Sequence, residues 1–169
     1  MSIRTTVFML LISLFAVHTF IHAQNNSEPS MLGDRIVNHI QSQKPDWKYE
    51  KVQPIADSAA VMVQQWTLDK RSIRIAIISH KSMQDAATAM SKLANEGQLN
   101  ERFQGLGDDG MMWGRGVVSF RKRNLTIDVS ATNTNPTLDL NEAAKNTADE
   151  RKLAKEFAVL AAEAIKDKQ

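Results

Sequence analysis

Residues 105–116 read Gly105-Leu-Gly-Asp-Asp-Gly-Met-Met-Trp-Gly-Arg-Gly116 and stand directly before two strongly patterned β segments. Their five glycines allow backbone angles that other residues resist, which indicates tight turns. Met111–Phe120 predicts one or two strands, and Leu125–Ala131 alternates apolar and polar residues as a strand buried on one face does. Between them Arg121–Asn124 predicts a hairpin turn, with Asn124 at positive φ. The rest of the chain is interpreted around this loop and hairpin.

Upstream of the loop, apolar periodicity predicts three strands and two helices. Ser82 is a good helix N-cap because its hydroxyl can accept a hydrogen bond from the amide of Asp85. Gly97 is expected to end that helix in a left-handed conformation. A long connection, Gln98–Gly110, then leads into the glycine-rich loop. The predicted segments are a helix at Met31–Gln43, strands at Trp47–Val52, Ala60–Leu68 and Ile73–Ser79, and a helix at 83–96.

Downstream, an apolar stripe predicts a last helix that runs to about Lys166. Its start is ambiguous, because Asn141 and Thr147 could each cap it. The element order is therefore a helix followed by two blocks, each a hairpin and then a helix. This order predicts an α+β two-layer sandwich: an antiparallel sheet of about five to six strands with helices on one face, and a ββα pseudo-repeat.

The N-terminus has the layout of a secretory signal peptide. Arg4 precedes an almost wholly apolar segment, Val7–Val17, and Ala23 is the expected last residue removed. Ile21 stands where a smaller residue is preferred, so an uncleaved anchor is the alternative. We therefore expect a signal peptide at 1–23, a flexible leader at 24–30 and one α+β domain at 31–169, in a periplasmic or secreted protein.

Composition narrows the classes of function. The chain has no cysteine, so disulfides and lipid attachment to a cysteine are excluded. Removal of Arg4 with the signal lowers the formal net charge from +2 to +1, which gives no overall field for nucleic acid. No segment after the signal is apolar enough to cross a membrane.

The chain resembles a group of small exported bacterial domains, distantly like the PknH-like extracellular sensor domain. The matching residues are Gly105–Asp109, the hairpin Val118-Ser-Phe-Arg-Lys-Arg-Asn124, and Val129-Ser130. The resemblance implies a strand–strand–helix block, this loop, a hairpin with a basic turn and a closing helix. Because most members are non-enzymatic or uncharacterised, the resemblance implies little chemistry. The cysteines common in sensor-type members are missing here, so a disulfide-built pocket is not expected.

The loop matches two ligand-binding patterns only formally. Gly105, Gly107 and Gly110 have the spacing of a dinucleotide fingerprint, but that motif needs a preceding strand and a following helix, and here a loop precedes and strands follow. Adjacent carboxylates suit calcium, yet the alternating Asp-x-Asp ladder is missing. His39 and His80 have no partner at metal-binding spacing. The sequence therefore predicts no metal and no cofactor.

Two sets of residues remain as candidates for binding. Asp108, Asp109, Met112 and Trp113 could form a ligand site, or the carboxylates could serve as turn-forming caps. The five glycines Gly105, Gly107, Gly110, Gly114 and Gly116 are assigned to the structure of the loop. The basic turns Lys70-Arg71 and Arg121-Lys122-Arg123 would form a cationic edge with Arg115 if both hairpins pointed the same way, and are otherwise solvated hairpin tips.

These observations favour an exported, non-catalytic module that binds an envelope or extracellular partner. The first alternative is a hydrolase of envelope material that uses a carboxylate of the loop. The second is a structural homodimer packed through an edge or a face of the sheet. Enzyme activity is the less favoured interpretation, because no nucleophile elbow or cysteine nucleophile is present.

Overall fold

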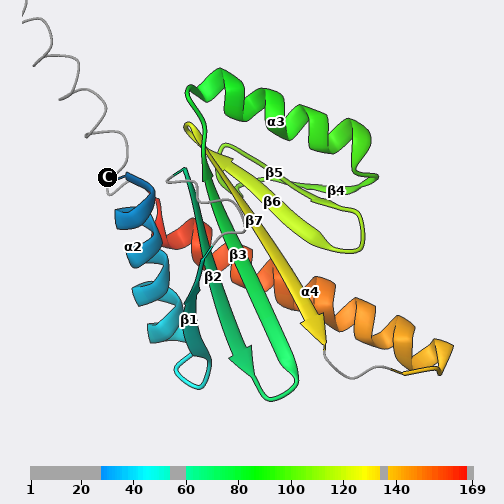
Figure 1. Ribbon diagram of the computed structural model, residues 1–169. Coiled ribbons are helices and arrows are strands. Elements are labelled where there is room, and N and C mark those ends of the chain that lie inside the picture. The colour runs from blue at the N-terminus through cyan, green and yellow to red at the C-terminus, as the bar shows by residue number, and fades with distance from the viewer. Residues whose placement is uncertain (1–27, 54–59, 134–136, 167–169) are drawn as a thin grey trace, which may run out of the picture.

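The computed structural model describes residues 28–53, 60–133 and 137–166. It confirms the α+β class: within these ranges, seven antiparallel strands form one open sheet that packs with three helices (Figure 1). The strand order is β1-β2-β3-β7-β6-β5-β4. The elements are α2 (Glu28–Gln43), β1 (Lys48–Val52), β2 (Val61–Leu68), β3 (Arg71–Ser79), α3 (Met83–Glu96), β4 (Leu99–Phe103), β5 (Asp109–Trp113), β6 (Val117–Lys122), β7 (Leu125–Asn133) and α4 (Leu140–Ala164).

The centre of the sheet is formed by the two strands with the clearest alternation. β3 pairs with β7 along its whole length, with Ile75 opposite Val129 and Ile77 opposite Ile127. These four side chains are fully buried on one face. Because side chains alternate between the faces of a strand, this register fixes which face of every neighbouring strand is apolar.

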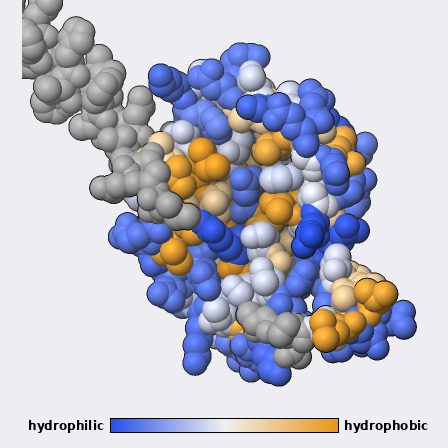
Figure 2. All heavy atoms as spheres, turned by 45° about the vertical axis from the view of Figure 1, so that its right-hand side comes forward, coloured by the Kyte–Doolittle hydropathy of each residue, from blue (hydrophilic) through white to orange (hydrophobic). Residues whose placement is uncertain are grey.

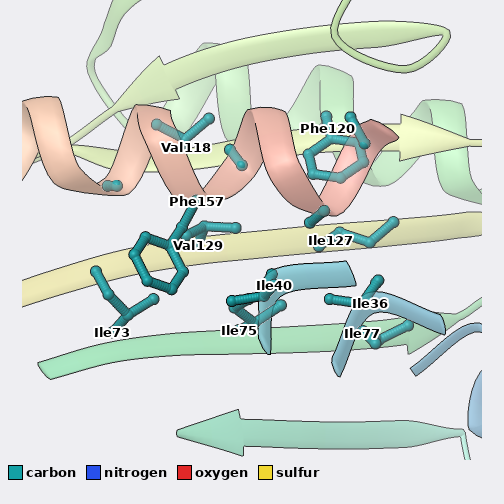
Figure 3. Packing of buried hydrophobic residues seen from close by; sticks show 14 of the residues in the cluster. Ile36, Ile40, Ile73, Ile75, Ile77, Val118, Phe120, Ile127, Val129 and Phe157 are labelled. Carbon is teal, nitrogen blue, oxygen red and sulfur yellow. The ribbon is translucent and has the colours of Figure 1, made fainter. Parts of the chain in front are cut away.

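Helices α2 and α4 cover that apolar face. Figure 3 shows Ile36 and Ile40 of α2 and Phe157 of α4 gathered over Ile73, Ile75 and Ile77 of β3. All six side chains are fully buried. The helices add small residues at the contact, since Ala154, Ala158 and Ala161 of α4 are also fully buried. This layer is the main hydrophobic core.

Helix α3 lies on the opposite face of the sheet, over β4 to β7. Met112 and Val118 point into the main core, so the alternate residues Met111 and Ser119, both fully buried, point to the other side. Ala86 and Met90 of α3 are buried outside the main core cluster. The hairpin–helix order therefore occurs twice along the chain, but the two helices that follow the hairpins cover opposite faces.

The sheet has one strand more than the upper end of the expected number. The additional strand, β4, lies inside the segment that was predicted to be a long connection. It occupies an edge and pairs with β5 through an irregular register between Leu99 and Glu101. Four of its five residues are exposed, so its sequence lacks the apolar alternation that marks β3 and β7.

Three local predictions about chain ends and turns were wrong. Gly97 ends α3 at φ −89°, and the left-handed residue is Gln98, at φ 55°. In the β6–β7 turn Arg123, and not Asn124, has positive φ. Helix α4 begins earlier than either candidate cap, because Asp139 accepts hydrogen bonds from the amides of residues 141 and 142. The Ser82 cap is confirmed, with the amide of Asp85 3.1 Å from its hydroxyl.

The predicted signal peptide, 1–23, lies outside the described residues, as does the leader to residue 27. Residues 28–30 were also expected to be leader, but they form the first turn of α2. None of the helices in the described ranges has the length and apolar character needed to span a membrane. The start of α4 is an exposed apolar tip, visible as a hydrophobic group at the lower right of Figure 2, where Leu138 and Leu140 are largely solvent-accessible.

Candidate functional site

The glycine-rich segment leads from the edge strand β4 through β5 to the start of β6. Gly105 and Gly107 turn the chain back into β5, and both have positive φ, 78° and 64°. Gly114 and Gly116 form the turn into β6, also with positive φ. Gly110 lies in β5, where a Cβ would come within 2.8 Å of Leu106. The residues of the loop therefore pack closely against one another and against the neighbouring strands.

Asp108 holds the basic turn between β6 and β7. One of its oxygens, Oδ2, accepts a hydrogen bond from the amide of Arg123 at 2.7 Å and lies 3.2 Å from the guanidinium of Arg121. The other, Oδ1, lies 3.9 Å from Nζ of Lys122. Its own amide donates to the carbonyl of Arg121 at 2.7 Å. Asp108 therefore ties the loop to the backbone of the basic turn and lies beside the side chains of Arg121 and Lys122.

The other three predicted ligand residues do not join Asp108 on one surface. Asp109 begins β5, and its Oδ1 lies 3.3 Å from the guanidinium of Arg102. Met112 is only 5% exposed and faces the α4 side of the sheet. Trp113 faces the α3 side, where a Cβ on Gly97 would come within 2.8 Å of its ring. The Met112 and Trp113 side chains thus point to opposite faces.

A polar network that the sequence did not single out lies on the α3 side of the sheet. The indole nitrogen of Trp113 donates to Ser119 Oγ at 2.7 Å, and Ser119 Oγ donates to Asp128 Oδ1 at 2.5 Å. His80 lies beside this network and contacts Thr126 Oγ1 through Nε2 at 3.0 Å. Ser119 is fully buried. Its hydroxyl links the side chains of Trp113 and Asp128 and is not accessible to a substrate.

Burial raises the pKa of Asp128, while the hydrogen bond from Ser119 and the charge of His80 act in the opposite direction. The folded state consequently binds this proton more tightly than the unfolded chain does. Its contribution to stability is therefore largest at low pH and falls as the pH rises from about the ordinary value of 3.8 through the folded pKa. At neutral pH the ionised, partly desolvated carboxylate of Asp128 lowers the stability of the folded state.

Asp128→Asn is therefore expected to raise the free energy of unfolding at pH 7 by on the order of 1 kcal/mol. The amide keeps an oxygen for Ser119 and removes the buried charge. Urea denaturation between pH 3 and pH 8 measures the difference, which should vanish near the low end. Asp109→Asn, which changes a more exposed carboxylate, is the control and should show no comparable gain. A less stable Asn variant at pH 7 would mean that Ser119 and His80 compensate the charge fully.

The two basic turns lie at opposite ends of the sheet. The β2–β3 turn carries Lys70 and Arg71, and Arg71 pairs with Asn133 at the end of β7. The β6–β7 turn lies at the start of β7, where Leu125 pairs with Ser79. Arg115, in the β5–β6 turn, lies at the same end of the sheet as Lys70. The combined cationic edge, which required both hairpins to point the same way, is therefore not formed.

Beside the loop, a groove of about 350 Å³ runs between β4 and α4. We call it the β4–α4 groove; its walls are Glu101–Leu106 on the strand side and Lys155, Val159, Ala162, Glu163 and Lys166 on the helix side. Phe103, one of the lining residues, is half-buried, and Nζ of Lys155 lies 4.4 Å from the centre of its ring. Lys155 also lies 3.3 Å from Glu101, so the strand and the helix are joined across the groove.

Within the described ranges, no three histidine, cysteine or acidic residues come together as a metal site. Comparison with known proteins adds no relative: no protein-family model, no curated protein and no solved structure matches the chain. The geometry of the loop, the buried network and the groove is therefore the basis for a functional hypothesis.

Proposed function

We propose that this protein is an exported, non-catalytic module that binds an extended segment of a partner protein in the β4–α4 groove. The observation that carries the proposal is the position of an exposed edge strand beside a groove that is lined by both apolar and charged side chains. The signal-like sequence at 1–23 supports export, and so does the resemblance to small exported domains that are mostly non-enzymatic or uncharacterised.

The edge strand supplies the first half of a peptide-binding site. In the described part of the sheet β4 pairs on one side only, with β5. An edge strand has backbone N–H and C=O groups that point outward and can pair with an added strand. In proteins that bind peptides by strand addition, these backbone hydrogen bonds provide affinity and adjacent pockets select alternate side chains.

The groove supplies the second half of the proposed peptide-binding site, a surface for the side chains of the bound segment. Val159, at 42% exposure, and the half-buried Phe103 offer apolar surface, and the groove is also lined by the buried Leu106. The walls carry three basic and two acidic residues, and two of the basic ones are already paired, Arg102 with Asp109 and Lys155 with Glu101. An added strand would place every second side chain toward this surface. The chemistry therefore favours a segment in which apolar residues alternate with polar ones.

The contacts of the loop carboxylates favour binding over hydrolysis. A carboxylate that serves as a general acid or base must reach the reacting group. Asp108 is held by Arg121 and the Arg123 amide, and Asp109 is paired with Arg102. Both carboxylates therefore have partners on the neighbouring strands and turn, which supports the non-catalytic interpretation.

Val159→Glu is the sharpest test of the groove. Decapeptides selected from a random phage-displayed library against the chain from Gln24 are the probes. The substitution places a charge in the apolar part of the groove and is expected to weaken the selected peptides by about tenfold or more, since about 1.4 kcal/mol corresponds to that factor. Leu140→Glu makes the same kind of change at an exposed position of the same helix, far from the groove, and should have no effect.

Hydrogen exchange then distinguishes the alternatives. Bound peptide should protect the amides of β4, 99–103, from exchange. Peptides that bind the Val159→Glu variant as well as the original chain would contradict the proposal, and so would protection confined to other strands. A concentration-dependent dimer in sedimentation equilibrium that protects β4 would instead assign this edge to a structural homodimer.

A further inference from the structure

We propose that two copies of this chain form a symmetric dimer by packing face to face through β1, β2 and β3. The surface involved lies on the side of these strands that points away from α2 and α4, and we call it the outer face. Helix α3 lies on the same side of the sheet, but its main contacts are with β4 to β7, and Figure 1 shows it displaced from β2 and β3. The residues of the outer face on which the proposal rests are Glu50, Val52, Val61, Gln65, Arg74 and Ile78.

The alternation of side chains along each strand assigns these residues to the outer face. Trp66 of β2 and Ile75 of β3 are buried in the main core, so Gln65 and Arg74, which stand next to them, point to the other side. The ring of Tyr49 lies 5.1 Å from that of Trp66, which places Glu50 of β1 on the outer face as well.

One end of the outer face is apolar. Val61 of β2 pairs with Ile78 of β3, and Val52 of β1 belongs to the next row of side chains. All three are half-buried. An antiparallel sheet that meets water on one face carries polar residues at the outward positions of that face. Three neighbouring aliphatic side chains at such positions favour contact with another apolar surface.

The middle of the outer face carries two opposite charges. Glu50, Gln65 and Arg74 are in register across the three strands, with Gln65 between the other two. Glu50 and Arg74 are both exposed. Among the residues that the structure describes, neither side chain has an ion-pair or hydrogen-bond partner. Each lies one strand away from Gln65, at about 4.8 Å per strand, so a negative and a positive charge stand at equal distances on its two sides.

This arrangement is self-complementary about a two-fold axis that runs along β2 above Gln65. Such an axis exchanges the two sides of β2 and keeps the direction of the strands, so Glu50 of each copy faces Arg74 of the other. It also places Val61 opposite Val61 of the other copy, which brings the two apolar ends together. An axis across the strands would instead place Glu50 on Glu50 and Arg74 on Arg74, and like charges in contact oppose association. The charges therefore select the first axis.

The size of the outer face predicts a reversible dimer. The three strands have five, eight and nine residues. At about 4.8 Å between strands and about 3.4 Å per residue they cover on the order of 400 Å². A stable interface of standard size takes about 800 Å² from each partner, so we expect a dissociation constant on the order of 10–100 µM. Strand β4 lies at the opposite edge of the sheet from β1, and both β4–α4 grooves therefore stay open in this dimer.

Sedimentation equilibrium of the chain from Gln24, which contains every described element, measures the association up to about 500 µM. Glu50→Lys and Arg74→Glu each place like charges opposite one another at both symmetric contacts. Each should weaken the dimer by on the order of a hundredfold. Both positions are exposed, so the fold should be retained. A chain that stays monomeric over the whole range would overturn the proposal.

Mixing the two single variants is the decisive step. One variant offers two positive charges and the other offers two negative ones, so an equimolar mixture should recover dimerisation to within a few-fold of the original chain. The double variant, Glu50→Arg with Arg74→Glu, should also dimerise. If the mixture stayed monomeric, the two residues would act within one chain, because a pair inside one chain cannot be repaired by a second chain.

Asp149→Lys is the matched control, since it makes the same change in net charge as Glu50→Lys at an exposed position of α4. It should leave the dimer unchanged, and an equal loss there would reduce the effect to net charge and contradict the proposal. Val159→Glu should not affect dimerisation, and Glu50→Lys should not affect peptide affinity, so failure of the dimer and failure of the peptide site are distinguishable. A dimer that survived both single reversals would not use the outer face.

Discussion

Gly107→Ala is expected to lower the free energy of unfolding by about 2–4 kcal/mol. Gly107 has φ +64°, a conformation that costs an L-residue on the order of 1 kcal/mol. A Cβ at this position would also come within 2.3 Å of the carbonyl oxygen of Arg121. That oxygen accepts the hydrogen bond from the Asp108 amide, so the loop would have to move away from β6 and release this bond.

Gly105→Ala separates the two contributions to that loss. Gly105 also has positive φ, at 78°, but a Cβ added there would have no neighbouring atom within 4 Å. Its cost should therefore be the backbone term alone, about 1 kcal/mol. Urea denaturation of both variants gives the comparison. If the two losses were equal, the contact between the loop and β6 would contribute nothing, and Asp108 would not depend on it to hold the basic turn.

The main architecture is predictable from the sequence because the central strands carry their own pattern. The isoleucines of β3 and the alternation of β7 are local properties, and both strands form as expected. β4 was missed because it lies at an edge, where Asn100, Glu101 and Arg102 are all exposed. A charged edge strand discourages aggregation and is hard to distinguish from a loop by hydropathy. The face covered by α3 is likewise set by packing that no local pattern encodes.

Turn geometry was predictable only where the decisive contact is local. Ser82 caps α3 through an amide three residues later, so the sequence contains the whole interaction. In the β6–β7 turn, Asn124 is intrinsically more tolerant of positive φ than Arg123. Arg123 adopts it nevertheless, and its amide is held by Asp108, 15 residues earlier in the chain. A hydrogen bond to a residue distant in sequence thus accompanies a positive φ at Arg123, against the intrinsic preference of that residue.

In the candidate site, too, individual residues could be predicted from the sequence but their tertiary contacts could not. The sequence drew attention to Asp108 as a ligand residue or a turn-forming cap, but it contains no signal that the partners of this carboxylate would be the Arg121–Arg123 turn. Asp128 did leave a signal, since a carboxylate in the middle of a central strand must be desolvated once its outer face is covered. The presence of Ser119 opposite Asp128 follows only from the strand register.

Phe157→Ala is expected to have the largest effect of any substitution considered, a loss of about 3–5 kcal/mol from the free energy of unfolding. The ring is fully buried, and its centre lies 4.8 Å from that of Trp47 and 6.4 Å from that of Trp66. Truncation removes the only side chain of α4 that joins this aromatic cluster, among the described residues, and leaves a cavity that rigid indoles cannot fill.

Val159→Ala is the matched control on the same helix. Val159 lies two residues further along and faces the groove, so losing two methyl groups there should cost less than about 1 kcal/mol. Guanidinium denaturation of both variants measures the difference. A domain of this size is stable by only about 5–15 kcal/mol, so Phe157→Ala should leave little margin at physiological temperature. If both variants lost similar amounts, α4 would not be anchored by its buried face, and the wall of the β4–α4 groove that it forms would lack the rigidity required for selecting a partner.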